Sequence, residues 1–181
     1  LPVSLTWRTA PAFDANAYLS ASLKNDTQGP WLPGDVNLVR DGLFIGTQYL
    51  AVTGPGAEAK FGFGADDRVE VKHQVARAAE GKTGILTTTT TRTESFVTTI
   101  VNRRDTPISV TVEDRLPVSE ADVITVELLS KSNPPTTTNL DGKRGVVAWT
   151  FDLGAGATKT LPFEWRATWP ADKPVIWSDG R

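Results

Sequence analysis

The sequence lacks cysteine and methionine altogether, and His73 is the single histidine among its 181 residues. Without cysteine the chain cannot form a disulfide, a thiolate metal site or a thiol nucleophile. A zinc site is also disfavoured, because such sites take three or four converging ligands and commonly more than one histidine. These absences remove several classes of enzyme and metalloprotein before any motif is considered.

Long apolar runs and clusters of positive charge are missing as well. No segment approaches the roughly 20 apolar residues of a membrane helix, and Lys and Arg are scattered singly in a chain of net charge −2. We expect no membrane span and no nucleic-acid partner, because phosphate binding requires clustered cations. The chain starts at Leu1 and has no Met, so we expect a fragment of a longer protein. The absence of cysteine favours a periplasmic or cell-envelope location.

The sequence is rich in the alternation of apolar and polar residues that is typical of β-strands. In "VVAWTFDL", residues 146–153, every second side chain is apolar. In "VNLVRDGLFIGTQYL", the pair Asp41-Gly42 suits a type I′ hairpin turn. "ARAAEGKTG", residues 76–84, interrupts the pattern. We therefore predict an all-β protein, with an antiparallel β-meander in residues 1–80 and an immunoglobulin-like β-sandwich with an extended C-terminal tail in residues 81–181.

The segment "FGFGADDRVEVKHQV", residues 61–75, places His73 near two aspartates and a glutamate. Strand alternation puts His73 on the same face as three valines, while Glu70 points to the opposite face. The pair Asp66-Asp67 follows a glycine, where turns use such side chains for backbone hydrogen bonds. We interpret the segment as a turn and a strand with a structural, partly buried histidine, and not as a metal or acid–base site.

Other chemical motifs are absent, with calcium as the alternative that stays open. The sequence has no G-x-S-x-G nucleophile motif and no phosphate-binding glycine loop. Calcium needs only oxygen ligands, and acidic residues gather at 66–67, 113–114 and 120–122, although without the spacing of an EF-hand loop. We predict no catalytic residue, no resident metal and no cofactor, and the chain is not expected to be an enzyme.

The six tryptophans suggest a carbohydrate platform or a packed core. Trp149 and Trp165 share strand faces with phenylalanines, which favours burial in a core. Trp31 and Trp177 lie in loop-like or terminal segments and are the candidates for exposed binding residues. Hydrolysis of a glycan would further need two carboxylates about 5 to 10 Å apart. The triplet that begins at Asn25, "NDT", fits an N-glycosylation sequon.

Several segments together carry a resemblance to a known family. They include "LPVSLTWRTAP", "WLPGDVNLVRDGLFIGT", "FGFGADDRVEVKH", "VNRRDTPISVTVEDRLPVSEADVITVEL" and "RGVVAWTFDLGAGATKTLPFEWRATWP". In this order they resemble the C-terminal part of mucoidy-inhibitor-A-like bacterial proteins, the family called domain of unknown function 4139. The resemblance implies an envelope role connected with exopolysaccharide production, and it supplies no catalytic residues. The family pattern more often has Arg or Lys where this chain has His73.

We therefore predict a non-catalytic β-rich protein-interaction or scaffolding module of a bacterial envelope protein. A protein partner is expected to pair with an exposed sheet edge. The Thr-rich segment 87–99 is the first candidate for that edge, and an interior strand is the other interpretation of this segment. The alternative function is a polysaccharide-binding or polysaccharide-cleaving domain linked to exopolysaccharide production, with Trp31 or Trp177 lining a groove.

Overall fold

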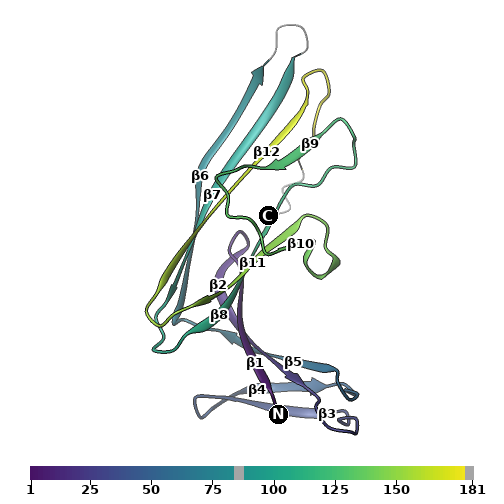
Figure 1. The fold of residues 1–181 in the computed structure, drawn as a ribbon, viewed down its shortest axis with the longest axis vertical. Coiled ribbons are helices and arrows are strands. Elements are labelled where there is room, and N and C mark those ends of the chain that lie inside the picture. Colours follow the sequence, from purple (N-terminus) through teal and green to yellow (C-terminus); the bar gives the residue numbers. More distant parts are fainter. Residues whose placement is uncertain (84–87, 178–181) are drawn as a thin grey trace.

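The structure is a computed structural model that describes residues 1–83 and 88–177. The described residues form β-strands and one short 3-10 helix, Leu140–Gly142, so the predicted all-β class is confirmed. The strands are arranged in a six-stranded sheet, a four-stranded sheet and a two-stranded hairpin. Figure 1 shows an elongated molecule, with the hairpin at one end and an arm of long strands at the other.

The six-stranded sheet combines strands from both ends of the chain. Its order is β10 (Thr137–Thr138), β11 (Val146–Leu153), β8 (Ile108–Arg115), β1 (Val3–Ala10), β2 (Asp14–Lys24) and β5 (Glu58–Ala65). Neighbouring strands are antiparallel except β1 and β8, which run parallel over Trp7–Thr9. The parallel pair joins a strand of the first 80 residues to a strand of the second half, so the two antiparallel units meet side by side in one sheet.

The four-stranded sheet forms the arm. Its order is β6 (Val69–Thr83), β7 (Thr89–Asn102), β12 (Thr158–Pro170) and β9 (Thr125–Leu128). The Thr-rich segment therefore lies inside the sheet, since β7 pairs with β6 on one side and with β12 on the other. The sheet edge expected at 87–99 is instead formed by β6. Part of that segment, residue 87, lies outside the described residues.

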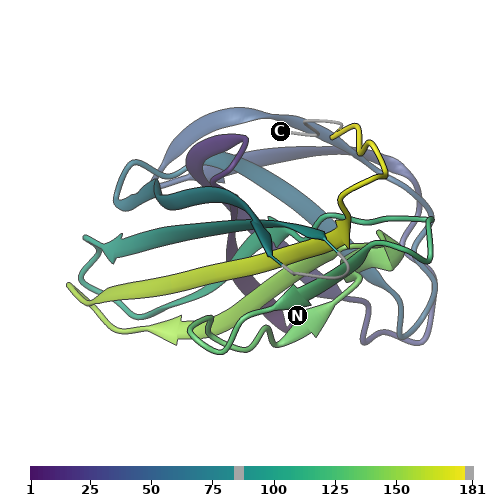
Figure 2. The same ribbon diagram turned by 90° about the horizontal axis from the view of Figure 1, so that it is seen from above.

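The hairpin consists of β3 (Gly34–Arg40) and β4 (Leu43–Leu50). Asp41 and Gly42 have φ angles of 51° and 81°, which confirms the predicted turn with positive φ at both central residues. A small apolar cluster of Leu38, Ala59 and Phe61 holds the hairpin against β5. Viewed from above, the blue hairpin lies on one side of the molecule and the green and yellow strands on the other (Figure 2).

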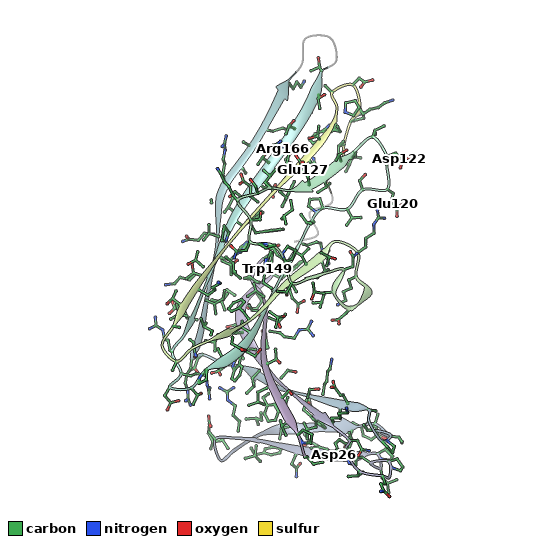
Figure 3. All side chains as sticks on the ribbon, in the orientation of Figure 1. Asp26, Glu120, Asp122, Glu127, Trp149 and Arg166 are labelled. Atoms are coloured by element: carbon green, nitrogen blue, oxygen red, sulfur yellow. The ribbon has the colours of Figure 1, made fainter. Side chains whose placement is uncertain are left out.

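The main core fills the space between the two larger sheets. Phe163 is its centre, with the Phe96 ring stacked at 6.2 Å and the Trp149 ring edge-on at 5.3 Å. Trp149 and Trp165 are 4% and 2% exposed, so the core assignment of both rings is confirmed. Trp149 lies in the middle of the molecule in Figure 3.

The predicted division of the chain near residue 80 falls inside strand β6. Residues 76–83, expected to interrupt the strands, continue β6 and pair with β7 after a register shift between Val75 and Arg77. The first 80 residues and the rest of the chain therefore share both larger sheets. Sequence periodicity detects strands but not their partners, and the alanines and glycine of this stretch are still compatible with a solvent-exposed hairpin arm.

Two buried asparagines reveal an internal structural repeat that the sequence does not display. Asn25 Nδ2 donates to Gly29 O and Thr53 O at 3.0 and 2.8 Å, and Asn102 Nδ2 donates to Thr106 O and Leu153 O at 2.9 and 3.1 Å. The backbone N–H groups of both asparagines donate to the alanine that ends a Gly-x-Gly-Ala turn, at residues 57 and 157. Both asparagines thus tie the end of one strand to the turn before its neighbour.

Candidate functional site

His73 has the structural role expected of it. Its ring stacks on Phe96 with 5.4 Å between ring centroids, and Nδ1 lies 2.9 Å from Thr98 Oγ1 on the adjacent strand. The side chain is half-buried, while Val75, expected on the same buried face, is 61% exposed. His73 therefore packs on a strand and does not converge with the nearby aspartates.

Asp66 is a buried carboxylate that accepts hydrogen bonds from four donors. Its side chain has no exposed area, and it accepts hydrogen bonds from Trp7 Nε1 at 2.8 Å, Arg40 Nη2 at 2.9 Å and Arg104 Nη1 at 2.8 Å. The backbone N–H of Arg68 donates to Oδ1 at 3.2 Å. The predicted turn role is thus confirmed, but the sequence did not indicate that Asp66 also joins β1, β3 and the β7–β8 turn.

Opposing effects act on the pKa of Asp66. Burial by itself raises the pKa, because it disfavours the charged carboxylate. The hydrogen bonds from Trp7 and the Arg68 backbone, together with the guanidinium groups of Arg40 and Arg104, outweigh burial and hold the pKa below its ordinary value. Asp66 is therefore a fully ionised structural anchor near neutral pH and is poorly suited to exchanging protons with a substrate.

A cavity of about 210 Å³ opens beside this anchor. Its walls include Leu5, Val39 and Phe63, and Arg40 and Arg104 line it as well. The Nε atom of Arg104 is buried and has no hydrogen-bond partner in the described part of the chain. The cavity therefore combines apolar walls with two arginine side chains.

Exposed apolar side chains flank the turn of the β3–β4 hairpin, and one of them, Val39, also lines this cavity. Val39 and Phe44 face each other across the two strands and are 55% and 64% exposed. Leu43 is 72% exposed and Ile45 43% exposed. We refer to Val39, Leu43, Phe44 and Ile45 together as the hairpin patch. Exposed apolar groups that gather in this way often mark contact surfaces.

A second and larger pocket, about 360 Å³, lies between the sheets and the C-terminal segment. Trp165 and Trp177 line it, together with the carboxyl residues Glu94 and Asp114. Arg92 donates from Nε to Glu94 Oε1 at 2.8 Å, and its guanidinium carbon lies 4.5 Å from the centre of the Trp177 ring. The sequence did not indicate this pocket, because its walls come from strands and loops that are distant in the chain.

The two predicted binding tryptophans lie in different places. Trp177 is half-buried and packs against Trp165 and Trp169, with centroid separations of 6.1 and 5.6 Å. Trp31 is also half-buried and pairs through its backbone with Thr53, beside the small apolar cluster under the hairpin. Both rings, predicted to be exposed, are of intermediate exposure. Only Trp177 lines one of the two pockets described above, and a binding role for either ring stays a prediction.

The C-terminal segment also differs from the expected extended tail. Residues 171–177 turn back after β12, and Val175 and Trp177 pack against the main core. Residues 178–181 lie outside the described residues. Apolar side chains in a terminal segment gain free energy by returning to the core, which explains this path.

Asn25, the first residue of the sequon, has no exposed surface. Its amide nitrogen donates two hydrogen bonds within the fold, as described above, and its Oδ1 accepts one from Thr27 Oγ1 at 2.7 Å. The folded protein therefore does not present this side chain for glycosylation.

The acidic groups considered for calcium lie apart. Figure 3 shows Glu120 and Asp122 on an outer loop. Glu113 pairs with Arg8, and Asp66 is held by arginines. Within residues 1–83 and 88–177, no three His, Asp or Glu side chains gather as they would around a metal ion. In the same ranges, no helix is long and apolar enough to cross a membrane.

Comparison with known proteins finds a family whose model matches nearly the whole chain. A family described as "Domain of unknown function (DUF4139)" matches residues 4–171. The chain belongs to the DUF4139 family. Among curated proteins, Protein F37C4.5 of Caenorhabditis elegans is 19% identical over 187 residues, which cover 99% of this chain and 34% of the nematode protein. No solved structure matches the chain.

The DUF4139 match extends from β1 to the first residue after β12. It therefore includes the Asp66 anchor, the hairpin patch and most of the wall of the larger pocket, but not Trp177. The chain spans about a third of the length of the nematode relative.

Proposed function

We propose that this DUF4139 domain is a non-catalytic protein-interaction module that binds a partner through the hairpin patch and the adjoining cavity. The hairpin patch is the observation that carries the proposal. Four neighbouring apolar side chains are exposed by 43% to 72% at the tip of one hairpin, and burying such area on a partner is the main driving force of association. The Asp66 anchor supports a rigid surface, because it fixes Arg40 at the end of β3.

Strand pairing at a sheet edge is a weaker candidate than the hairpin patch. The edge strand β6 bears exposed Lys72, Arg77, Glu80 and Lys82, and it shifts register between Val75 and Arg77. Charged side chains and bulges are the features by which proteins protect free edges against added strands. We therefore propose that the expected protein partner contacts the side chains of the hairpin patch and does not pair with the edge strand β6.

The chemistry of the cavity defines the occupant. A partner segment would insert one apolar side chain between Leu5, Val39 and Phe63, because these side chains form an apolar wall. An oxygen next to that side chain, a backbone carbonyl or a carboxylate, would lie beside the Arg40 and Arg104 side chains that line the same cavity. Interfaces of this kind combine an apolar anchor in a pocket with a few satisfied polar contacts.

A non-catalytic role is supported by the ionisation state of the buried carboxylate Asp66. Asp66 is saturated by donors and has a lowered pKa, whereas a general base is most effective with a pKa near the working pH. We also propose that the module acts in a bacterial cell envelope. The support for that location is the absence of cysteine and the resemblance to mucoidy-inhibitor-A-like proteins.

The test compares two valines on different surfaces. Val39→Asp changes the rim of the cavity, and Val75→Asp is the matched control, since both side chains lie on strands and are 55% and 61% exposed. A photo-crosslinking residue placed at position 39 of the intact protein in its host should trap a specific partner that position 75 does not trap. The purified partner should then bind the unmodified protein and bind Val39→Asp about tenfold or more weakly, as expected for a lost anchor contact.

Thermal melts of both variants establish that the fold is intact. Equal loss of binding in Val39→Asp and Val75→Asp, or equal crosslinking from both positions, would overturn the proposal. A crosslink formed only between two copies of this chain would mean that the hairpin patch binds a second copy of the chain and not a different protein. A partner trapped at position 75 alone would transfer the function to the β6 edge.

A further inference from the structure

We propose that the larger pocket, between β7, β8, β12 and the C-terminal segment, is a saccharide-binding site. The proposal does not depend on the protein-interaction surface, because the two sites share no lining residue. In this proposal Trp165 donates a hydrogen bond to the ligand, and Trp177 forms part of the pocket wall. The volume of the pocket, about 360 Å³, lies within the range of small-molecule sites, roughly 300–1,000 Å³.

The indole N–H of Trp165 is the first observation that points to a ligand. Trp165 is only 2% exposed, and its Nε1 atom is buried without a hydrogen-bond partner among the residues described. Two other buried tryptophans show the usual arrangement: Trp7 Nε1 donates to Asp66 and Trp149 Nε1 donates to Asn133 O, at 2.8 and 2.9 Å. A buried donor without an acceptor is costly and rare, so a ligand oxygen at Trp165 would complete the pocket.

The charged residues of the pocket wall favour a ligand with hydroxyl groups over an anionic ligand. Glu94 and Asp114 are 7% and 6% exposed, and buried carboxylates disfavour a second anion nearby. Arg92, Arg115 and Arg144 also line the pocket, and Arg144 already donates to Ser119 O at 2.9 Å. A wall that contains both acceptors and donors matches hydroxyl groups, because each hydroxyl donates one hydrogen bond and accepts others.

The apolar part of the wall suits the carbon face of a sugar ring. Ile124 and Val126 stand with Trp165 and Trp177 around the pocket. Aromatic rings provide a flat apolar surface together with a polar edge. The Arg92 guanidinium over the Trp177 ring links the C-terminal segment to Glu94, so this contact holds the wall in place. A purely apolar ligand would leave the Trp165 N–H without an acceptor.

The tryptophan N–H signals allow a direct test with internal controls. A ¹⁵N-labelled sample of the intact chain has six tryptophans and therefore six indole signals. We would titrate it with cellobiose, chitobiose and galactose, and separately with inorganic phosphate. A bound saccharide should shift the Trp165 and Trp177 signals with saturation and leave those of Trp7 and Trp149 in place, because the last two already have protein acceptors.

Variants then separate binding from folding. Trp177→Ala should weaken saccharide binding about tenfold or more, which is the loss of one good contact, and Trp31→Ala is the matched control with unchanged affinity. The melting temperature of each variant reports on the fold. No saturable shift with any of these saccharides overturns the proposal, as does a shift with phosphate alone or an equal effect of the two variants. Loss of protein binding at the hairpin patch would leave this result unaffected.

Discussion

Asp66 joins segments that are far apart in the chain into one rigid junction. Trp7 lies 59 positions before it and Arg104 lies 38 positions after it, yet both donate to the same oxygen, Oδ2. The Arg104 guanidinium also lies over the Trp7 ring, with 5.4 Å from its carbon to the ring centre. Charge-assisted hydrogen bonds of this kind are stronger than neutral ones, so the residue holds β1, β3 and the β7–β8 turn together.

Asp66→Asn should destabilise the fold by about 3–5 kcal/mol, because it leaves two half-buried guanidinium groups without their buried counter-charge. Asp67→Asn is the matched control, since Asp67 is exposed and should change stability by less than about 0.5 kcal/mol. Urea unfolding at neutral pH measures both changes. Similar effects of the two substitutions would contradict the anchoring role.

The same residue predicts part of the response to acid. The folded-state pKa of Asp66 is below its ordinary value, so its contribution to stability is complete above the unfolded-state pKa of about 4. It is lost as the pH falls through the lower folded-state pKa. Asp66→Asn should therefore show a shallower loss of unfolding free energy below about pH 4 than the unmodified chain.

Two turns between elements need glycine for different reasons. Both require a left-handed backbone, and one of them also leaves no room for a side chain. Gly42 and Gly145 have φ angles of 81° and 82°. A Cβ at Gly42 would meet no atom within 4 Å, whereas a Cβ at Gly145 would lie 2.7 Å from Leu116 O and would collide with Val118. Strand alternation and the Asp-Gly pair predicted the first turn. The second depends on the loop after β8, which local sequence does not position.

Gly42→Ala should cost about 1–2 kcal/mol of unfolding free energy from backbone strain alone. Gly145→Ala should cost clearly more, about 2–5 kcal/mol, because the clash with backbone adds to the same strain. Chemical denaturation of the two variants measures the difference. Equal costs would mean that the loop at 116–118 moves away freely.

The whole molecule is held together by pairings between its two halves. β1 pairs with β8, β6 pairs with β7, and the main core draws side chains from both larger sheets. The repeated asparagine motif links each half internally, at Asn25 and at Asn102, while these pairings join the halves. A division at residue 80 would cut β6 and would expose the inner faces of both sheets.

Fragments 1–80 and 81–181 should therefore each fail to fold, whereas the intact chain should unfold in one cooperative transition. The expected result is poor dispersion in ¹⁵N NMR spectra of both fragments and a single transition for the whole. A dispersed spectrum from either fragment alone would show that the halves are independent domains.

Local sequence was enough to predict most of the strands, the Asp41-Gly42 turn, the burial of Trp149 and Trp165 and the structural role of His73, but not the continuation of β6 through residues 76–83. Each of these follows from local alternation or local turn chemistry, which need no knowledge of distant residues. Tertiary structure alone decided the interior place of the Thr-rich strand, the arginines of Asp66, the hairpin patch and the pocket at Trp165 and Trp177. These features arise where strands distant in the chain pack together, and packing depends on the register and twist of whole sheets.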